Sequence, residues 1–178
     1  MANLVGHHLR LRLVELEDAE YIHSLRLDPQ YGRFLSAPAP TVESQQSWIE
    51  RYKAREAERR EYYFLIERRQ DDLPCGVVRL YEIKDGQFTW GSWILDKNKP
   101  PKAALDSALL IYRFAFEVLA CELSIFDVRV ENSRTLAFHR RFGAVETGVD
   151  ELNVYFELSR EQFALRVDQL NAAFRADD

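Results

Sequence analysis

The stretch Trp90–Leu105, WGSWILDKNKPPKAAL, decides the fold. A strand-like run of aromatic and aliphatic residues ends in a turn rich in lysine and proline, and an alanine-rich helix begins directly after that turn. The start of a helix has unpaired backbone N–H groups and the positive end of the helix dipole, so this junction is a candidate phosphate site. The turn itself contains no glycine. The alternative is therefore a proline-stiffened turn whose lysines are solvated.

The donors of such a phosphate site would be backbone groups of the first helical turn. Pro100 and Pro101 suit a helix start but supply no N–H group. The donors would therefore belong to the residues that follow, which are Lys102, Ala103, Ala104 and Leu105. Asp106 would oppose an anion there, although it suits the helix dipole.

The helix after the turn is expected to be deeply buried. It extends over residues 103–120, AALDSALLIYRFAFEVLA. At about 100° per residue, the charged residues Arg113 and Glu117 of this helix each fall within roughly 20° of Asp106. Nearly all of the remaining circumference is apolar, so we expect this helix to pack against a sheet.

The other segments predict a mixed α/β fold. Leu9, Leu11 and Leu13 alternate with arginines, which is typical of a half-buried strand. Thr41 is a candidate N-cap with Ser44 three residues later, and the helix it opens is expected to reach about residue 59. Three strands joined by short turns predict an antiparallel meander over residues 61–68, 75–83 and 88–95. A strand over 125–130, parallel to the third of these, would complete a βαβ crossover around the long helix. A strand over 153–158 and a helix over 160–176 close the predicted order.

Length and composition limit the possible functions. A chain of 178 residues predicts one domain over residues 1–178. Its 24 Lys and Arg against 29 Asp and Glu give a net charge of −5, so nucleic acid is not an expected partner. Two cysteines indicate neither a disulfide framework nor a metal site, and no metal is expected. With no apolar run long enough for a membrane span and no signal-peptide pattern at the N-terminus, we expect a soluble, cytoplasmic protein.

The segment NSRTLAFHRRFG over residues 132–143 reads as a helix that directs a histidine inward. Asn132 is a good N-cap and Gly143 a good residue to end the helix. On a helical wheel, His139 lies between Leu136 and Phe142 in one arc, away from the arginines. An inward His139 is either a functional group or a core histidine bonded to the backbone.

This order and three strings resemble the GNAT acyltransferase superfamily, within it the branch of ribosomal-protein N-terminal acetyltransferases. The strings are LRLRLVELEDAEYIHSLRLDP, GSWIL and VENSRTLAFHRRFGA, and the resemblance covers about residues 8–158. It implies a central mixed, mostly antiparallel sheet flanked by helices on both faces. It also implies acetyl-CoA as co-substrate and transfer of an acetyl group to a primary amine by direct attack.

The resemblance implies a cofactor site along the strand and the turn. It assigns to acetyl-CoA the residues Trp93, Ile94, Leu95, Lys102, Ala103, Ala104 and Asn132, with a backbone N–H near Leu95 as the oxyanion donor. The sequence departs from the family pattern Arg/Gln-x-x-Gly-x-Gly/Ala: Lys99, Lys102 and Ala104 stand at its three defined positions. In the last motif, this sequence has His139 where the family frequently has tyrosine, and Ala144 where the family motif closes with phenylalanine.

Acetyl transfer from a thioester needs a base for the amine, a donor for the oxyanion and a proton for the thiolate. His139 is the candidate proton donor, because it lies near the family tyrosine and histidine donates or accepts near neutral pH. Glu82 is the candidate base, and its alternative is a solvated strand carboxylate. Asp127 and Glu131 are weaker candidates on the polar face of their strand.

The acceptor stays open among three alternatives. The combined motifs resemble GNAT members that acetylate nucleotide-linked amino sugars, and Arg or Lys placed for a diphosphate would favour that class. An acidic groove would favour an N-terminal peptide, while the altered turn would suit a non-catalytic acyl-CoA-binding module.

Tyr31, Phe34 and Trp90 are candidate acceptor-pocket residues, although Trp90 is equally a core aromatic, and Trp48 raises the same possibility. Strand alternation places Trp90 and Ser92 on one face and Trp93 on the other. We expect a small-molecule amine substrate and a monomer or homodimer.

Overall fold

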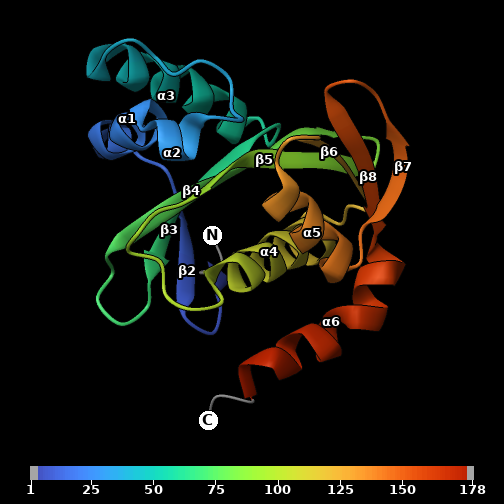
Figure 1. Cartoon of the computed structure of the whole chain (residues 1–178). Helices are drawn as coiled ribbons and strands as arrows, with labels where there is room; N and C mark the ends of the chain where they lie inside the picture. The colour runs from blue at the N-terminus through green and yellow to red at the C-terminus, as the bar shows by residue number, and fades with distance from the viewer. Residues whose placement is uncertain (1–3, 176–178) are drawn as a thin grey trace.

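One mixed sheet of eight strands organises the molecule, in the order β1-β2-β3-β4-β5-β6-β8-β7. The computed structural model describes residues 4–175 (Figure 1). The strands are β1 (Leu4–Val5), β2 (Leu9–Leu13), β3 (Tyr62–Arg68), β4 (Pro74–Lys84), β5 (Gln87–Leu95), β6 (Leu123–Arg129), β7 (Val145–Val149) and β8 (Asn153–Ser159). The helices are α1 (Ala19–Leu27), α2 (Pro29–Gly32), α3 (Val42–Ala57), α4 (Ala103–Arg113), α5 (Ser133–Phe142) and α6 (Arg160–Arg175). A 3₁₀ turn (Leu16–Asp18) precedes α1, and a π-helical turn (Phe114–Val118) extends α4.

The predicted topology is confirmed in its main features. β3, β4 and β5 form the antiparallel meander, and β5 and β6 are the parallel pair joined through α4. The sequence did not reveal β1, which has two residues, or β7. All five residues of β7 are exposed, so this edge strand lacks the apolar alternation by which a strand is recognised.

Helices cover both faces of the sheet, as expected (Figure 1). On one face, α1 and α3 pack on β3–β5 through a core that includes Ile22, Ile49 and Leu65. On the other face, α4, α5 and α6 share the larger core with the inner side of the sheet. Within residues 4–175, no helix combines the length and the apolar character that a bilayer span requires.

The long helix α4 is buried as predicted, but its first charged residue lies on the inside. Asp106 is 1% exposed, and its carboxylate accepts hydrogen bonds from three successive backbone N–H groups, those of His7 (3.0 Å), His8 (2.7 Å) and Leu9 (2.9 Å). Arg113 is exposed. Asp106 therefore anchors the start of α4 to the β1–β2 connection, and its charge does not point at the turn before the helix.

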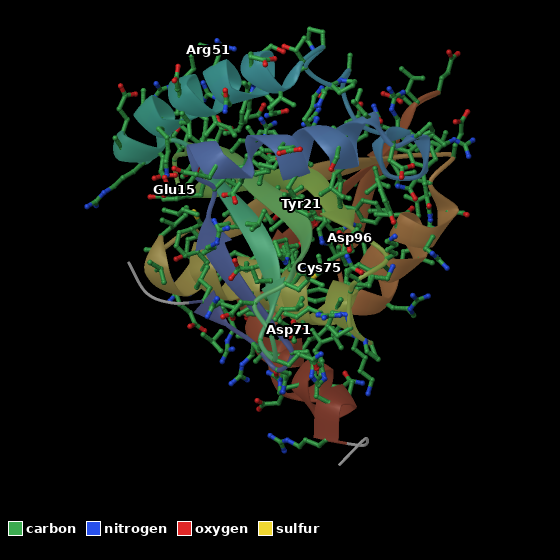
Figure 2. All side chains as sticks on the ribbon, turned by 90° about the vertical axis from the view of Figure 1, so that its left-hand side faces the viewer. Glu15, Tyr21, Arg51, Asp71, Cys75 and Asp96 are labelled. Carbon is green, nitrogen blue, oxygen red and sulfur yellow. The ribbon has the colours of Figure 1, made fainter. Side chains whose placement is uncertain are left out.

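The turn between β5 and α4 is held from the opposite side of the sheet. Asp96 is buried; its Oδ2 accepts from Tyr21 of α1 (2.7 Å), and its Oδ1 accepts from the Asn98 N–H (2.7 Å). The Asp96 N–H donates to the carbonyl of Cys75 (2.8 Å), and Figure 2 shows Tyr21, Asp96 and Cys75 close together beneath α1. The Tyr31 hydroxyl accepts from the Lys97 N–H (3.1 Å). The turn is thus fixed by polar contacts as well as by its prolines.

Both predicted helix caps are present. The Thr41 and Ser44 side chains each accept a hydrogen bond from the other residue's N–H, so a serine completes the reciprocal cap that Glu or Gln usually makes. At the start of α5, Asn132 accepts from the Thr135 N–H (3.4 Å), and Gly143 ends the helix with φ 112°.

Candidate functional site

The central cavity lies where two neighbouring parallel strands separate. β5 and β6 pair only at Gln87–Leu123 and Phe88–Ser124. Beyond these pairs the strands diverge, and a cavity of about 310 Å³ lies between residues 90–93 of β5 and 126–129 of β6. We call it the central cavity; its further walls include Tyr81, Asn132, His139 and Phe34. The cavity exposes backbone groups of both strands that would otherwise pair with each other.

A β-bulge in β5 causes this separation and corrects one expectation. Ser92 has φ 46°, and Ser92 and Trp93 together stand opposite the single residue Val78 of β4. A bulge bends its strand and resets the alternation of side chains. Trp90 and Trp93 therefore lie on the same face, with ring centroids 5.0 Å apart, and not on opposite faces as strict alternation predicts.

Both tryptophans donate to α4. The Trp90 indole N–H donates to the Tyr112 hydroxyl (3.0 Å), and the Trp93 indole N–H donates to the Ser107 hydroxyl (3.2 Å). Trp90 is 4% exposed, so its core role is observed, while both rings also line the central cavity. The wall of the cavity on this side is consequently rigid.

His139 faces inward from α5 and lines the central cavity, as the wheel predicted. It is 3% exposed and surrounded by the rings of Phe126, Trp90, Phe138, Phe156 and Trp93, at centroid distances of 4.5 to 6.0 Å. Burial lowers the pKa of His139 to about 3. The Nδ1 atom of His139 is buried and has no hydrogen-bond partner. This nitrogen therefore does not form the hydrogen bond to the backbone that a core histidine would make. The ring is neutral at physiological pH.

The two candidate carboxylates differ in their position. Asp127 is exposed, as Glu82 is, but it lines the central cavity, where desolvation raises its pKa and Arg129 acts in the opposite direction. Glu82 is exposed, accepts a hydrogen bond from the Thr89 hydroxyl (3.2 Å) and is not among the residues that line this cavity. Asp127, the weaker candidate from sequence, thus has the better position for a base.

The glycine-free turn adopts a backbone conformation that normally selects glycine. Lys102, at the first glycine position of the family pattern, is the N-cap of α4 with φ 59°. Its stem turns toward α6, where the ammonium group donates to the Ala173 carbonyl and lies 5.8 Å from the Phe174 ring centroid. The lysine side chain is therefore directed toward α6. Lys99 instead lines a basic cavity of about 580 Å³ on the other side of the turn, together with Arg68 and Arg69.

An apolar groove adjoins the first turn of α4. This α4 groove, of about 320 Å³, is lined by Lys102, Ala104, Leu105, Phe138, Arg141, Phe142 and Leu170. The N–H groups of Ala104 and Leu105 belong to the first helical turn, where intrahelical acceptors are missing. Phe138 of the groove packs on Trp93 of the central cavity, with centroids 5.2 Å apart. These two rings lie between the groove and the cavity.

The remaining predicted residues fall into three groups. Asn132 lines the central cavity as well as capping α5. Ile94 is 3% exposed and packs toward α1 and α3, Ala103 is 2% exposed in the larger core, and Leu95 packs against that core. Their side chains therefore line neither the central cavity nor the α4 groove. Phe34 lines the central cavity, whereas Tyr31 supports the turn.

Sequence reasoning missed two arginines. Arg129, at the end of β6, lines the central cavity, and Arg141, near the end of α5, lines the α4 groove. Arg129 is two residues from Asp127 and so lies on the same strand face, a spacing that was available as a signal. Arg141 was assigned only to the outer face of its helix.

The family follows from comparison with known proteins. A family model described as the acetyltransferase (GNAT) domain matches residues 8–145. The chain belongs to the GNAT acetyltransferase family. The GNAT fold and acyltransferase activity, predicted from the sequence, are therefore confirmed. That one such domain extends over residues 1–178 stays a prediction.

Solved structures add detail to the GNAT assignment. FdhC, described as a nucleotide-linked sugar GNAT, is 38% identical, with a TM-score of 0.88 over 94% of this chain and 96% of that one. A ribosomal-protein-S5-alanine acetyltransferase from Vibrio fischeri is 12% identical (TM-score 0.77; 92% and 99% covered). A chimera of the spermidine N-acetyltransferase SpeG from Vibrio cholerae and hSSAT is 20% identical (TM-score 0.76; 89% and 99% covered). The last two share the fold alone. No curated protein matches the sequence.

Proposed function

We propose that this GNAT enzyme transfers an acetyl group from acetyl-CoA to the primary amine of a nucleotide-linked amino sugar. The observation that carries the proposal is the central cavity, in which an ionisable carboxylate, a neutral imidazole and a strand bulge converge between β5 and β6. The 38% identity to a nucleotide-linked sugar GNAT supports this acceptor class over a peptide terminus. The ribosomal-protein enzymes support only the fold.

We propose that acetyl-CoA extends from the α4 groove to the central cavity. Its diphosphate would accept hydrogen bonds from the first-turn N–H groups of Ala104 and Leu105, with Arg141 supplying positive charge. Its pantetheine arm would pass the Trp93–Phe138 pair and reach Asn132. The direction of the Lys102 side chain supports this path, because its ammonium group contacts α6 while Lys102 still forms one wall of the groove.

The amine must lose a proton before it attacks. We propose that Asp127 accepts that proton, directly or through water, because it is the carboxylate that lines the cavity and its raised pKa makes it a stronger base than an ordinary aspartate. Glu82 stays the alternative base. The nitrogen lone pair then forms a bond to the thioester carbonyl carbon, and the carbonyl electrons move to oxygen.

The oxyanion would be stabilised by backbone N–H groups at the bulge. Ser92 and Trp93 stand opposite one residue of β4, so the bulge interrupts the regular ladder next to the cavity. This position replaces Leu95, which does not line the cavity, as our proposed donor. Collapse of the intermediate breaks the C–S bond and releases the CoA thiolate.

The thiolate needs a proton, and His139 does not carry one to spare at neutral pH. A ring with a pKa of about 3 is neutral at this pH, and its unpartnered Nδ1 is left for one hydrogen bond. We propose that His139 orients the thioester by that bond, and that the thiolate takes its proton from the ammonium formed on attack. The reaction thus releases the amide, CoA thiol and the proton held by Asp127.

The test compares two carboxylate variants in a thiol-release assay with acetyl-CoA and a nucleotide-linked amino sugar. Asp127→Asn is expected to lower kcat/KM by roughly 10²- to 10⁴-fold, the usual contribution of a general base. Glu82→Gln is the matched control and is expected to stay within a few-fold of the wild type. If Glu82→Gln is the damaged variant and Asp127→Asn is not, the base is Glu82. If the wild type acetylates no amino-sugar nucleotide but acetylates a peptide terminus, the proposed acceptor is wrong.

We also propose a cytoplasmic location, supported by two free cysteines, Cys75 and Cys121, that are both buried. The state of assembly, monomer or homodimer, stays a prediction.

A further inference from the structure

A second, smaller cavity adjoins the central cavity. This outer cavity, of about 200 Å³, is lined by residues of the loop after α2, the end of β6 and the β7–β8 turn. Phe34 and Arg129 line both cavities. The two cavities are therefore neighbours, and a ligand whose amine lies beside Asp127 would meet Arg129 and Phe34 on the side of the outer cavity.

Arg33 and Arg129 line the outer cavity and form no salt bridge with any carboxylate that the structure describes, although Arg129 lies close enough to Asp127 to act on its pKa. Among residues 4–175, no Asp or Glu lies within salt-bridge distance of Arg33 or Arg129, whereas Arg79 of the central cavity already pairs with Glu61 (3.3 Å). The Arg33 guanidinium lies 5.0 Å from the centroid of the Phe34 ring. Two positive charges and an aromatic surface are thus available together on one side of the acceptor site.

The walls of the outer cavity are held in place before any ligand binds. On one side, the Asp150 carboxylate accepts from the N–H groups of Leu152 and Asn153 (2.8 Å each), which fixes the β7–β8 turn. On the other, Arg26 of α1 donates to the carbonyl (3.1 Å) and hydroxyl (2.9 Å) of Ser36 and so restrains the loop that carries Phe34. The cavity is therefore a preformed site and not a gap between free loops.

From this geometry we infer that the outer cavity binds the nucleoside diphosphate part of the acceptor, with Arg129 and Arg33 contacting the diphosphate and Phe34 the nucleoside. Arginine matches phosphate oxygens in geometry and in charge, and an aromatic ring offers a stacking surface for a base. The carboxylates of Glu131 and Glu151 line the far end, where they accept from ribose hydroxyls or base N–H groups. The inference rests on the proposed function and adds the residues that select the nucleotide.

Calorimetric titration of the protein with uridine diphosphate or thymidine diphosphate, in the presence of CoA, tests the site. Arg129→Met and Arg33→Met are each expected to weaken nucleotide binding tenfold or more, and the Michaelis constant for acetyl-CoA is expected to stay unchanged. Arg51→Met is the matched control, because Arg51 is an exposed arginine on the outer side of α3 (Figure 2) and lines none of the four cavities. Equal affinity of the wild type and Arg129→Met for both nucleotides overturns the inference.

A substrate pair separates this inference from the proposed function. The wild type is expected to acetylate the nucleotide-linked amino sugar with a kcat/KM at least tenfold above that of the same amino sugar as its 1-phosphate, and Arg129→Met is expected to reduce that ratio. Equal use of both sugars by the wild type overturns the nucleotide site and leaves amino-sugar acetylation intact. Acetylation of a peptide N-terminus, with no use of either sugar and no competition from either nucleoside diphosphate, overturns both.

Discussion

Replacing His139 by leucine is expected to flatten the acid dependence of stability. Leucine is close to histidine in size, and its apolar side chain suits the surrounding aromatic rings. The folded protein holds this histidine neutral with a pKa of about 3, while an unfolded histidine titrates near its ordinary value of about 6.5. Between these values the unfolded chain binds one more proton than the folded chain, so the free energy of unfolding falls as the pH falls.

The magnitude follows from the two pKa values. At pH 5 the unfolded histidine is almost fully charged and the buried one is neutral, which costs the wild type about 2 kcal/mol relative to pH 7.5. The full cost of about 5 kcal/mol is reached only below pH 3, where the folded histidine is protonated as well. His139→Leu removes this term and leaves all other titrating groups in place, so the difference between the two proteins isolates it.

Urea unfolding at pH 5.0, 6.0, 6.5 and 7.5 measures this difference. The stability of His139→Leu relative to the wild type should rise by about 2 kcal/mol from pH 7.5 to pH 5.0, with most of the rise below pH 6.5. His139→Gln, which does not titrate but keeps a buried polar group, should show the same pH slope with a lower stability throughout. A stability difference that is constant with pH would refute the reasoning, because it would mean that His139 titrates alike in the folded and unfolded states.

Three further predictions concern the start of α4, the cap of α5 and the acid limb of activity. Asp106→Ala should lower the free energy of unfolding by about 3 kcal/mol or more, because three backbone N–H groups lose their acceptor. Asp106→Asn should lower it less. A loss below about 1 kcal/mol for the alanine variant would contradict the anchoring role. Asn132→Ala should lower the free energy of unfolding by about 1 kcal/mol in thermal or urea unfolding, because the helix cap is lost. It should also raise the KM for acetyl-CoA through the lost contact with the pantetheine arm. An unchanged KM would leave the cap as the only role of Asn132. In a pH–rate profile, kcat/KM should fall as the pH falls through the raised pKa of Asp127, because the Asp127 carboxylate is ionised only above that pKa. If the residual activity of Asp127→Asn shows the same fall at acid pH, the fall belongs to another group.

Much of the candidate site followed from local sequence. Period-two alternation identified β2, and the apolar circumference identified α4 as a buried helix. The inward direction of His139 follows from helical geometry alone and is confirmed by its burial. These predictions succeeded because each depends on interactions between residues that are close in the chain.

Long-range packing decided what the sequence left open. The left-handed conformation of Ser92 creates a bulge that places Trp93 beside Trp90, and no local pattern of apolar residues encodes it. The pKa of His139 depends on rings contributed by β5, β6, α5 and β8, which only the tertiary structure assembles. The direction of the Lys102 stem depends on α6, about 70 residues later in the chain. Sequence by itself determined the family, the order of the elements other than β1 and β7, and the helix that carries the histidine. The tertiary structure alone decided which carboxylate and which arginines meet at the cavity, because strand separation and side-chain burial are properties of contacts between distant segments.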